Sequence, residues 1–273
     1  MIAALRTEFR KITTTRAWWI NATVMFGYMV VMSAIMAASF VLGMRAAEGS
    51  ETSPSSGQLV LDPQAAASSV YTLAVALGYI FPALLGALVV TSEFRHQTIT
   101  PTLLAEPRRS LVLGSKLAAV LPFGIAVALA GVLGAVIGGA ATLAVMGEPT
   151  FLADASMQRT IALSVVALVI WSLVGVGFGS VLTNQVAAIV VLLAFTQFVE
   201  PLLRLLLAQF DATEMISKFL PGAAGEAIAG SSLYVSSGLA DLLQPWQGVL
   251  VLFSYAVVFT IIGRLTTFRR DIG

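Results

Sequence analysis

Six long apolar stretches, separated by shorter polar segments, dominate the chain. A helix needs about 20 mostly apolar residues to cross roughly 30 Å of hydrocarbon at about 1.5 Å per residue. Backbone groups left unpaired in lipid are costly, so such stretches form helices. The pattern predicts an all-α membrane protein with six transmembrane helices, over Trp18 to Leu42, Val70 to Thr91, Leu117 to Val145, Thr160 to Leu182, Val186 to Leu207 and Trp246 to Gly263.

The residues before the first apolar stretch are amphipathic. Their apolar positions recur at helical spacing and are Ile2, Leu5, Phe9 and Ile12. The other face carries Arg6, Glu8, Arg10 and Lys11. This spacing predicts a helix within residues 1–17 that lies on the inner membrane surface. The alternative is a solvated basic flank that only sets the membrane topology.

Composition and charge agree with a membrane location and give it an orientation. Hydrophobic residues make up 58% of the chain and charged residues 11%, and the mean hydropathy is +0.93. With a cytoplasmic N-terminus, eleven of the fifteen basic residues fall on the inner side, which is the positive-inside pattern. We therefore expect one domain over 1–273, with a six-helix membrane part over 18–264 and a cytoplasmic tail over 265–273.

The polar loop from Ser92 to Ser110 joins the second and third predicted spans on the cytoplasmic side. Thr100 followed by Pro101 predicts a helix start, Pro107 a helix end, and Ser110 a cap for the third span. A bare connection could be as short as Thr183 to Gln185, between the fourth and fifth spans. The length and mixed charge of the loop favour a docking element, although a connection that only sets topology would also be polar.

This loop resembles that of permeases from ATP-binding-cassette exporters of the type 2 family. The residues that carry the resemblance, in order, are Glu93, Arg95, Thr98, Leu103, Leu104, Pro107, Arg108 and Lys116. The layout of six spans with a long outer segment before the last one is also similar. One departure is Gln97, because the family often has glycine just before the threonine.

The resemblance implies a coupling helix over Glu93 to Thr102 that seats in an ATPase subunit, beside a connecting helix over Leu5 to Thr15. The implied ATPase-coupling residues are Glu93, Phe94, Arg95, His96, Thr98, Thr100, Pro107 and Arg108. The implied connecting-helix residues are Leu5, Phe9, Arg10 and Ile12. The implied partners are ATPase subunits that bind ATP and Mg, a second permease subunit, identical or related, and membrane lipid.

By the same resemblance, the chain is a multi-pass protein of a bacterial plasma membrane. It would export a hydrophobic or amphiphilic solute, such as a drug, a lipid-like molecule or a peptide, by alternating access. The alternative is a membrane anchor or regulatory subunit that moves no solute.

The chain offers little catalytic chemistry of its own. It has no G-x-x-x-x-G-K-[ST] sequence to cradle phosphates, no cysteine, and a single histidine, His96, in the cytoplasmic loop. We therefore expect a transport subunit and not an enzyme, with no catalytic residue, no metal or cofactor in this chain, and no nucleic-acid partner.

Several residues within the spans are candidates for a transport pathway or gate. They are Tyr79, Phe81, Phe195, Phe198 and Glu200. An ionisable group at bilayer depth is costly and is a functional candidate by default. The alternative is that Glu200 pairs with Arg204, four residues later, and only ends or kinks the fifth span. Pro82 predicts a kink in the second span.

Two further patterns concern packing. Glycines in the third and fourth spans predict close helix approach; they are Gly131, Gly134, Gly138, Gly175, Gly177 and Gly179. The segment from Ala208 to Pro245 predicts a short amphipathic helix, a turn at Pro221 and Gly222, and a second helix. The resemblance implies a roof over the pathway there, and a surface loop is the alternative.

Overall fold

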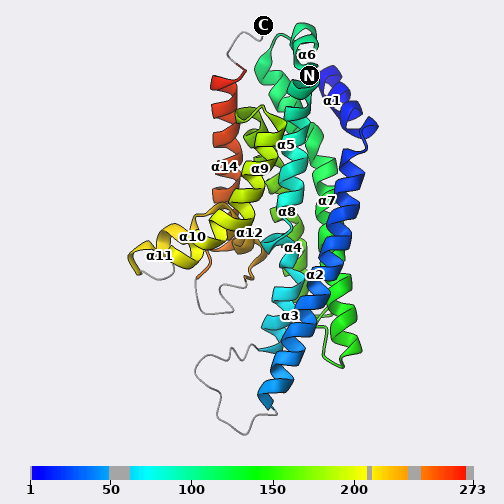
Figure 1. The fold of residues 1–273 in the computed structure, drawn as a ribbon, viewed down its shortest axis with the longest axis vertical. Coiled ribbons are helices and arrows are strands. Elements are labelled where there is room, and N and C mark those ends of the chain that lie inside the picture. The colour runs from blue at the N-terminus through cyan, green and yellow to red at the C-terminus, as the bar shows by residue number, and fades with distance from the viewer. Residues whose placement is uncertain (1, 49–61, 208–210, 233–240, 269–273) are drawn as a thin grey trace.

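The long helices run roughly side by side and form an elongated bundle (Figure 1). The computed structural model describes residues 2–48, 62–207, 211–232 and 241–268 of the chain. The continuous long helices are α2 (Ala17–Glu48), α7 (Arg109–Val145), α8 (Ala155–Val181) and α14 (Pro245–Thr266). These four and the segment Gln185–Leu207 are long and apolar enough to cross a membrane. In the described residues all regular elements are helices, which confirms the all-α prediction.

Two short helices lie at one end of the bundle, the end at which α14 also has its C-terminus (Figure 1). Helix α1 (Ile2–Thr14) precedes α2, and α6 (Ile99–Ala105) lies in the loop between α5 (Ile80–Arg95) and α7. The N-terminal helix is therefore confirmed. Helix α14 ends at Thr266, within the cytoplasmic tail predicted over 265–273, and residues 269–273 lie outside the described part.

The second predicted span is not one helix. It consists of α3 (Pro63–Tyr71), α4 (Leu73–Ala76) and α5 (Ile80–Arg95), so the prediction of a continuous helix over Val70 to Thr91 is wrong. Pro82 lies in the first turn of α5, where a missing N–H leaves no gap in the helical bonding. The proline therefore marks a restart of the helix rather than a kink within it.

The fifth predicted span bends at a π-helical turn. It consists of α9 (Gln185–Ala194), the π-helix η1 (Phe195–Val199) and α10 (Glu200–Leu207). A π turn adds a residue to the helical repeat and shifts the faces that follow it. Glu200 and Arg204 are consequently buried while Phe198 is exposed. Helix α10 and the following α11 (Asp211–Lys218) project sideways from the bundle (Figure 1).

Helix α12 (Pro221–Ala229) follows α11 and returns into the bundle, where it packs against α14, α8 and α4. Two helices were predicted in this segment and are found, but the turn predicted at Pro221 and Gly222 is wrong. Pro221 occupies the first position of α12, which suits a residue without an N–H. Every residue of α12 is buried, so a surface loop is excluded for 221–229.

The predicted close approach of helices at glycines is confirmed. A Cβ on Gly134 of α7 would lie 2.6 Å from the carbonyl oxygen of Phe26 in α2. A Cβ on Gly179 of α8 would lie 2.7 Å from the carbonyl oxygen of Ala87 in α5. The glycines therefore allow close packing between helices within the chain.

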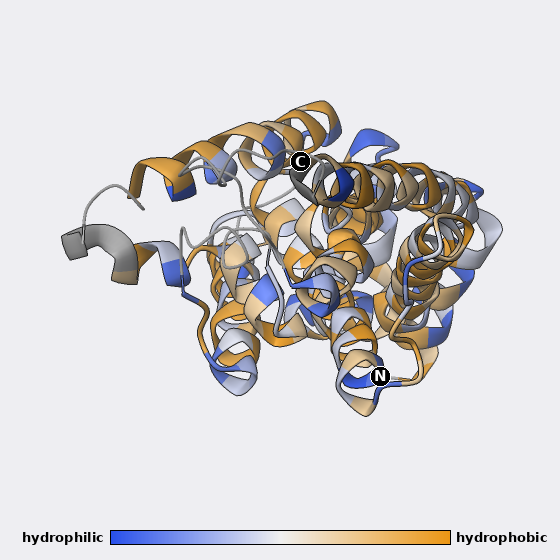
Figure 2. Cartoon of the chain, turned by 90° about the horizontal axis from the view of Figure 1, so that it is seen from below, coloured by the Kyte–Doolittle hydropathy of each residue, from blue (hydrophilic) through white to orange (hydrophobic). Residues whose placement is uncertain are grey.

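Many of the exposed side chains on the long helices are large and hydrophobic. Hydrophobic residues predominate along these helices (Figure 2).

Candidate functional site

Four charged side chains meet where α1, α5 and α7 converge, and we call them the elbow network: Glu8, Lys11, Glu93 and Lys116. Lys116 Nζ lies 2.7 Å from Glu8 Oε2 and 2.7 Å from Glu93 Oε1. Lys11 Nζ lies 2.7 Å from Glu8 Oε1 and 2.6 Å from Glu93 Oε1. Each carboxylate therefore contacts both ammonium groups, and the two charge signs balance.

The elbow network is sheltered from solvent. Lys116 is 0% exposed, and both glutamates are buried. Burial of Lys11 lowers its pKa, but hydrogen bonds to Glu8 and Glu93 outweigh that effect, so the pKa of Lys11 is raised. A buried ion network stabilises the fold only when all of its charges are present. Removing one partner leaves an uncompensated buried charge.

The segment from His96 to Arg108, which we call the elbow, is fixed to this network. The Thr98 N–H donates to the carbonyl of Glu93 at 2.9 Å, which closes the turn after α5. Lys11 Nζ donates to Thr102 Oγ1 at 3.1 Å, which ties α6 to α1. Side chains in direct contact therefore connect α6 with α1, α5 and α7.

Gln97 gives the elbow its turn. Its φ of 55° lies in the left-handed region, which glycine adopts at no cost and other residues adopt at about 1–2 kcal/mol. Gln97 thus adopts a backbone conformation that glycine favours.

The elbow differs in detail from its predicted boundaries. Helix α6 begins at Ile99, so Thr100 and Pro101 lie inside its first turn and Thr100 is not the cap. Helix α7 begins at Arg109 and is preceded by Arg108, so Ser110 is not a cap either. Pro107 lies between the two helices, where it was expected to end the first one.

The predicted coupling residues fall into two groups. Glu93 is buried in the elbow network, and Phe94 packs edge-on against Phe268, with ring centroids 6.1 Å apart. The others have exposed side chains; they are Arg95, His96, Thr98, Thr100, Pro107 and Arg108. Leu104, on α6 among them, is 78% exposed. The elbow thus has an exposed apolar residue as well as exposed polar and basic ones.

The predicted connecting-helix residues lie on two faces of α1. Ile12 is buried and Leu5 is half-buried, and Phe9 contacts Phe123 of α7 with ring centroids 5.1 Å apart. Arg10 is exposed. Glu8 was expected on the polar face but is buried, because Lys116 approaches it from α7.

Sequence reasoning missed Glu8 and Lys11 as members of the site. A signal was present, since Leu5, Glu8 and Ile12 follow one another at spacings of three and four residues and so share a helix face. A carboxylate on the apolar face of a helix needs a basic partner from elsewhere. The chain supplies it as Lys116.

A cavity of about 500 Å³ opens beside the elbow network, between α1, α5 and the start of α9. Its lining includes Lys11, Trp18, Glu93, His96 and Gln185.

In the described part of the chain, no group of three or more histidine, aspartate or glutamate side chains is arranged to hold a metal ion.

Most of the predicted gate residues lie elsewhere, at mid-height in the bundle. We call Tyr79, Glu200, Arg204 and Glu226 the mid-bundle cluster. Arg204 bridges the two carboxylates, at 3.0 Å from Glu200 Oε1 and 3.0 Å from Glu226 Oε1. The predicted pair of Glu200 and Arg204 is therefore present, and Glu226 joins it from α12.

The backbone of α12 completes this cluster. Glu200 Oε1 accepts hydrogen bonds from the N–H groups of Gly222 at 2.6 Å and Ala223 at 3.3 Å. A carboxylate at a helix N-terminus satisfies donors that the helix leaves unpaired. Glu200 thus holds α12 against α10 and does more than end the fifth span.

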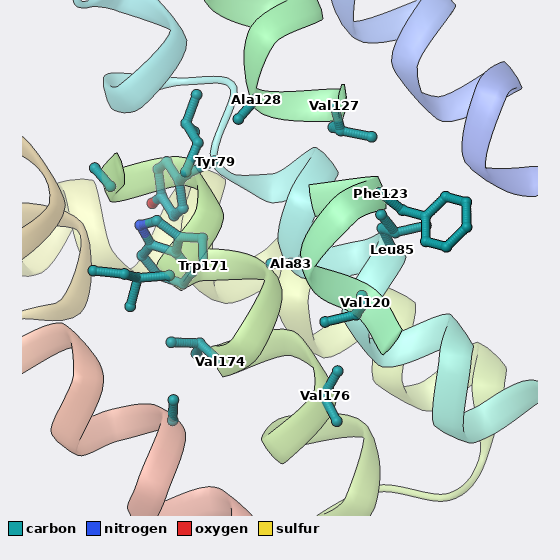
Figure 3. Packing of buried hydrophobic residues seen from close by; sticks show 14 of the residues in the cluster. Tyr79, Ala83, Leu85, Val120, Phe123, Val127, Ala128, Trp171, Val174 and Val176 are labelled. Carbon is teal, nitrogen blue, oxygen red and sulfur yellow. The ribbon is translucent and has the colours of Figure 1, made fainter. Parts of the chain in front are cut away.

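The aromatic gate candidates are not gathered in one place. Tyr79 stacks on Trp171 of α8 with ring centroids 4.5 Å apart (Figure 3). Phe81 contacts Tyr28 of α2 at 5.8 Å between ring centroids. Phe195 is half-buried, and Phe198 is exposed on the outer face of the bundle. Tyr79 and Glu200 therefore belong to one cluster, which Phe198 does not join.

No protein-family model matches the chain, and no curated protein matches it. In the described part of the chain, five segments are long and apolar enough to cross a membrane, and they indicate a multi-pass helical membrane protein.

Proposed function

We propose that this chain is the permease subunit of an ATP-driven exporter of the type 2 ATP-binding-cassette family. In this proposal six segments cross a bacterial plasma membrane, the broken segment α3 to α5 being the second, and both termini are cytoplasmic. Two permease subunits pair, and separate ATPase subunits bind ATP and Mg. The transported solute is hydrophobic or amphiphilic.

The observation that carries the proposal is the connection between the elbow and the helices of the bundle. The elbow offers a partner an exposed apolar residue, Leu104, and an exposed basic one, Arg108, and exposed Arg95 directly precedes the elbow in the chain. Behind this surface, Lys11 links α6 to α1, and Glu93 links α5 to Lys116 of α7. A push on α6 would therefore move three helices together.

Such a push has to favour one conformation over another. A partner that binds both conformations equally shifts neither, so the ATPase must bind the elbow differently in its open and closed states. A balanced, buried ion network suits this task because it keeps its geometry while the elements around it move as a body.

ATP hydrolysis by the reconstituted complex tests the proposal. The full chain is placed in lipid with the ATP-binding-cassette ATPase encoded beside it, and wild type is compared with Leu104→Ala and Arg95→Ala at equal complex yield. We expect the variants to lose most of the permease-dependent stimulation of hydrolysis. Val145→Ala is the matched control, because Val145 is 88% exposed at the opposite end of α7.

The outcome also separates the proposal from an anchoring subunit. An anchor would assemble with the ATPase but leave hydrolysis unchanged, in the wild type and the variants alike. Equal hydrolysis with and without the permease, in an intact complex, would contradict the proposal.

A further inference from the structure

The mid-bundle cluster has unequal numbers of positive and negative groups. Glu200 and Glu226 supply two carboxyl groups, and Arg204 is the basic side chain that bridges them. Two nearby segments of the chain, 208–214 after α10 and 233–240 after Ser232, contain no lysine or arginine. With both glutamates ionised the cluster would carry an excess negative charge, and Glu200 is 1% exposed. An uncompensated buried charge is strongly unfavourable.

The hydrogen bonds of Tyr79 point to the group that removes this excess. A tyrosine hydroxyl has a single hydrogen to donate. The Tyr79 hydroxyl oxygen lies 2.7 Å from the carbonyl oxygen of Thr196, which can only accept. Its hydrogen therefore goes to Thr196, and its lone pairs face Glu200 Oε2 at 3.4 Å. In this arrangement Glu200 Oε2 and the Tyr79 hydroxyl oxygen form a hydrogen bond when Glu200 supplies the hydrogen.

We propose that Glu200 binds a proton in the folded protein and donates it from Oε2 to Tyr79, so that the mid-bundle cluster is a proton-binding site. Oε1 then acts as the carbonyl oxygen that accepts from Arg204, Gly222 and Ala223. Those three donors also suit an ionised carboxylate, so the hydrogen count at Oε2 and the charge of Glu226 decide between the two forms. With the proton in place, Arg204 and Glu226 balance each other.

The groups that face Glu200 come from several elements. Arg204 lies on α10, the same helix as Glu200. Glu226 lies on α12, and Glu226 Oε2 accepts a hydrogen bond from Ser232. Tyr79 precedes α5, and Tyr255 of α14 donates to the carbonyl of Phe219 at 3.2 Å. Helix α8 contributes Trp171, whose buried indole N–H has no hydrogen-bond partner among the described residues. Arg204 is thus the cation available to balance Glu226.

The position of the proton gives it a mechanical role. Glu200 joins α10 to the N-terminus of α12, and Tyr79 joins both to the break between α4 and α5. Loss of the proton would bring two negative charges onto one guanidinium and would leave the Tyr79 hydroxyl with one hydrogen for two acceptors, Thr196 and Glu200. The proton therefore stabilises the contact between the broken second span, α3 to α5, and α12. This inference stands apart from the proposed function, because it needs no ATPase.

Infrared spectroscopy of the full chain in lipid tests the proposal, because a protonated carboxyl has a C=O band that a carboxylate lacks. At neutral pH we expect a buried carboxylic-acid band that disappears in Glu200→Gln and shifts in Tyr79→Phe. Glu226→Gln should also remove the band, although Glu200 is still present, because Glu200 then becomes the counter-ion of Arg204 and ionises. Glu148→Gln, on a glutamate outside the cluster, should leave the band unchanged.

The variants are compared at equal yield and with the same elution on gel filtration. Absence of a Glu200-dependent acid band in folded wild type would overturn the proposal, and so would a band that survives Glu226→Gln unchanged. A band that appears only when sodium is withheld would also overturn it, since the site would then hold a metal cation.

Discussion

The elbow network and the mid-bundle cluster both bury two glutamates beside basic side chains, but they differ in charge balance and in backbone. The elbow network has two lysines for its two glutamates, and its members lie on regular helices. The mid-bundle cluster has one arginine for two glutamates and lies at a π turn, a helix break and a helix N-terminus. The first arrangement suits the transmission of movement by a rigid unit, and the second suits a change of protonation.

The largest effect is expected when the balance of the elbow network is broken. Lys116→Met shortens the side chain by one atom and removes a fully buried charge, and should destabilise the protein by about 3–5 kcal/mol. Thermal unfolding in detergent measures the loss. Arg10→Met, on the exposed face of α1, should change little.

A second variant sharpens this test. Glu8→Gln combined with Lys116→Met removes one charge of each sign and should recover much of the stability, because Lys11 and Glu93 remain paired. Additive losses in the double variant would mean that the four charges do not act as a unit.

The next effect probes the close approach of α12 to Glu200. A Cβ on Gly222 would lie 2.6 Å from Glu200 Oε1 and 2.6 Å from an Arg204 guanidinium nitrogen. Gly222→Ala should therefore destabilise by about 1–3 kcal/mol. Gly114→Ala in α7 has open space at the same position and should stabilise by about 0.5–1 kcal/mol. Equal signs for the two substitutions would contradict the packing.

Lys11 allows the elbow network to be tested by pH. Its pKa is raised by Glu8 and Glu93 against the effect of burial, so its stabilising charge is fully present below the unfolded value of about 10.4 and is lost as pH rises through the higher folded value. The side chain is 34% exposed, so we expect Lys11→Met to cost about 1 kcal/mol at neutral pH. The difference from wild type should shrink above about pH 10.4, and a difference that grows there would contradict the network.

The smallest effect is expected at Arg108, the last residue of the elbow, which we call the elbow tip. Arg108 is exposed and pairs with Glu106 at 2.9 Å, and this contact raises the pKa of Arg108 and lowers that of Glu106. Solvent screens such pairs, so Arg108→Ala should leave the unfolding midpoint unchanged. A clear drop in the midpoint would mean that the elbow tip is part of the fold rather than a free surface.

The comparison also shows what a sequence can predict. The length of the apolar stretches predicted the long helices, the helical spacing of apolar residues predicted α1, and Thr100, Pro101 and Pro107 predicted a helix in the region of α6. These signals depend on residues close together in the chain. The break at Thr72 and at Leu77 to Tyr79 was not predicted, because its apolar residues look the same in a continuous helix.

The charge partners escaped prediction for a similar reason. Glu200 and Arg204 are four residues apart and were paired from sequence, whereas Glu226 reaches them only through the packing of α12. Glu8 meets Lys116 across 108 positions. Contacts of this kind depend on the tertiary fold, and no local periodicity encodes them.

Cross-linking from the elbow tests the central claim, that this surface docks an ATPase, most directly. The chain has no cysteine, so Leu104→Cys and Val145→Cys each introduce a single site for a photoreactive label. We predict that the label at position 104 captures the purified ATPase in the reconstituted complex and that the label at position 145 does not. An assembled complex in which position 104 captures no ATPase would contradict the account.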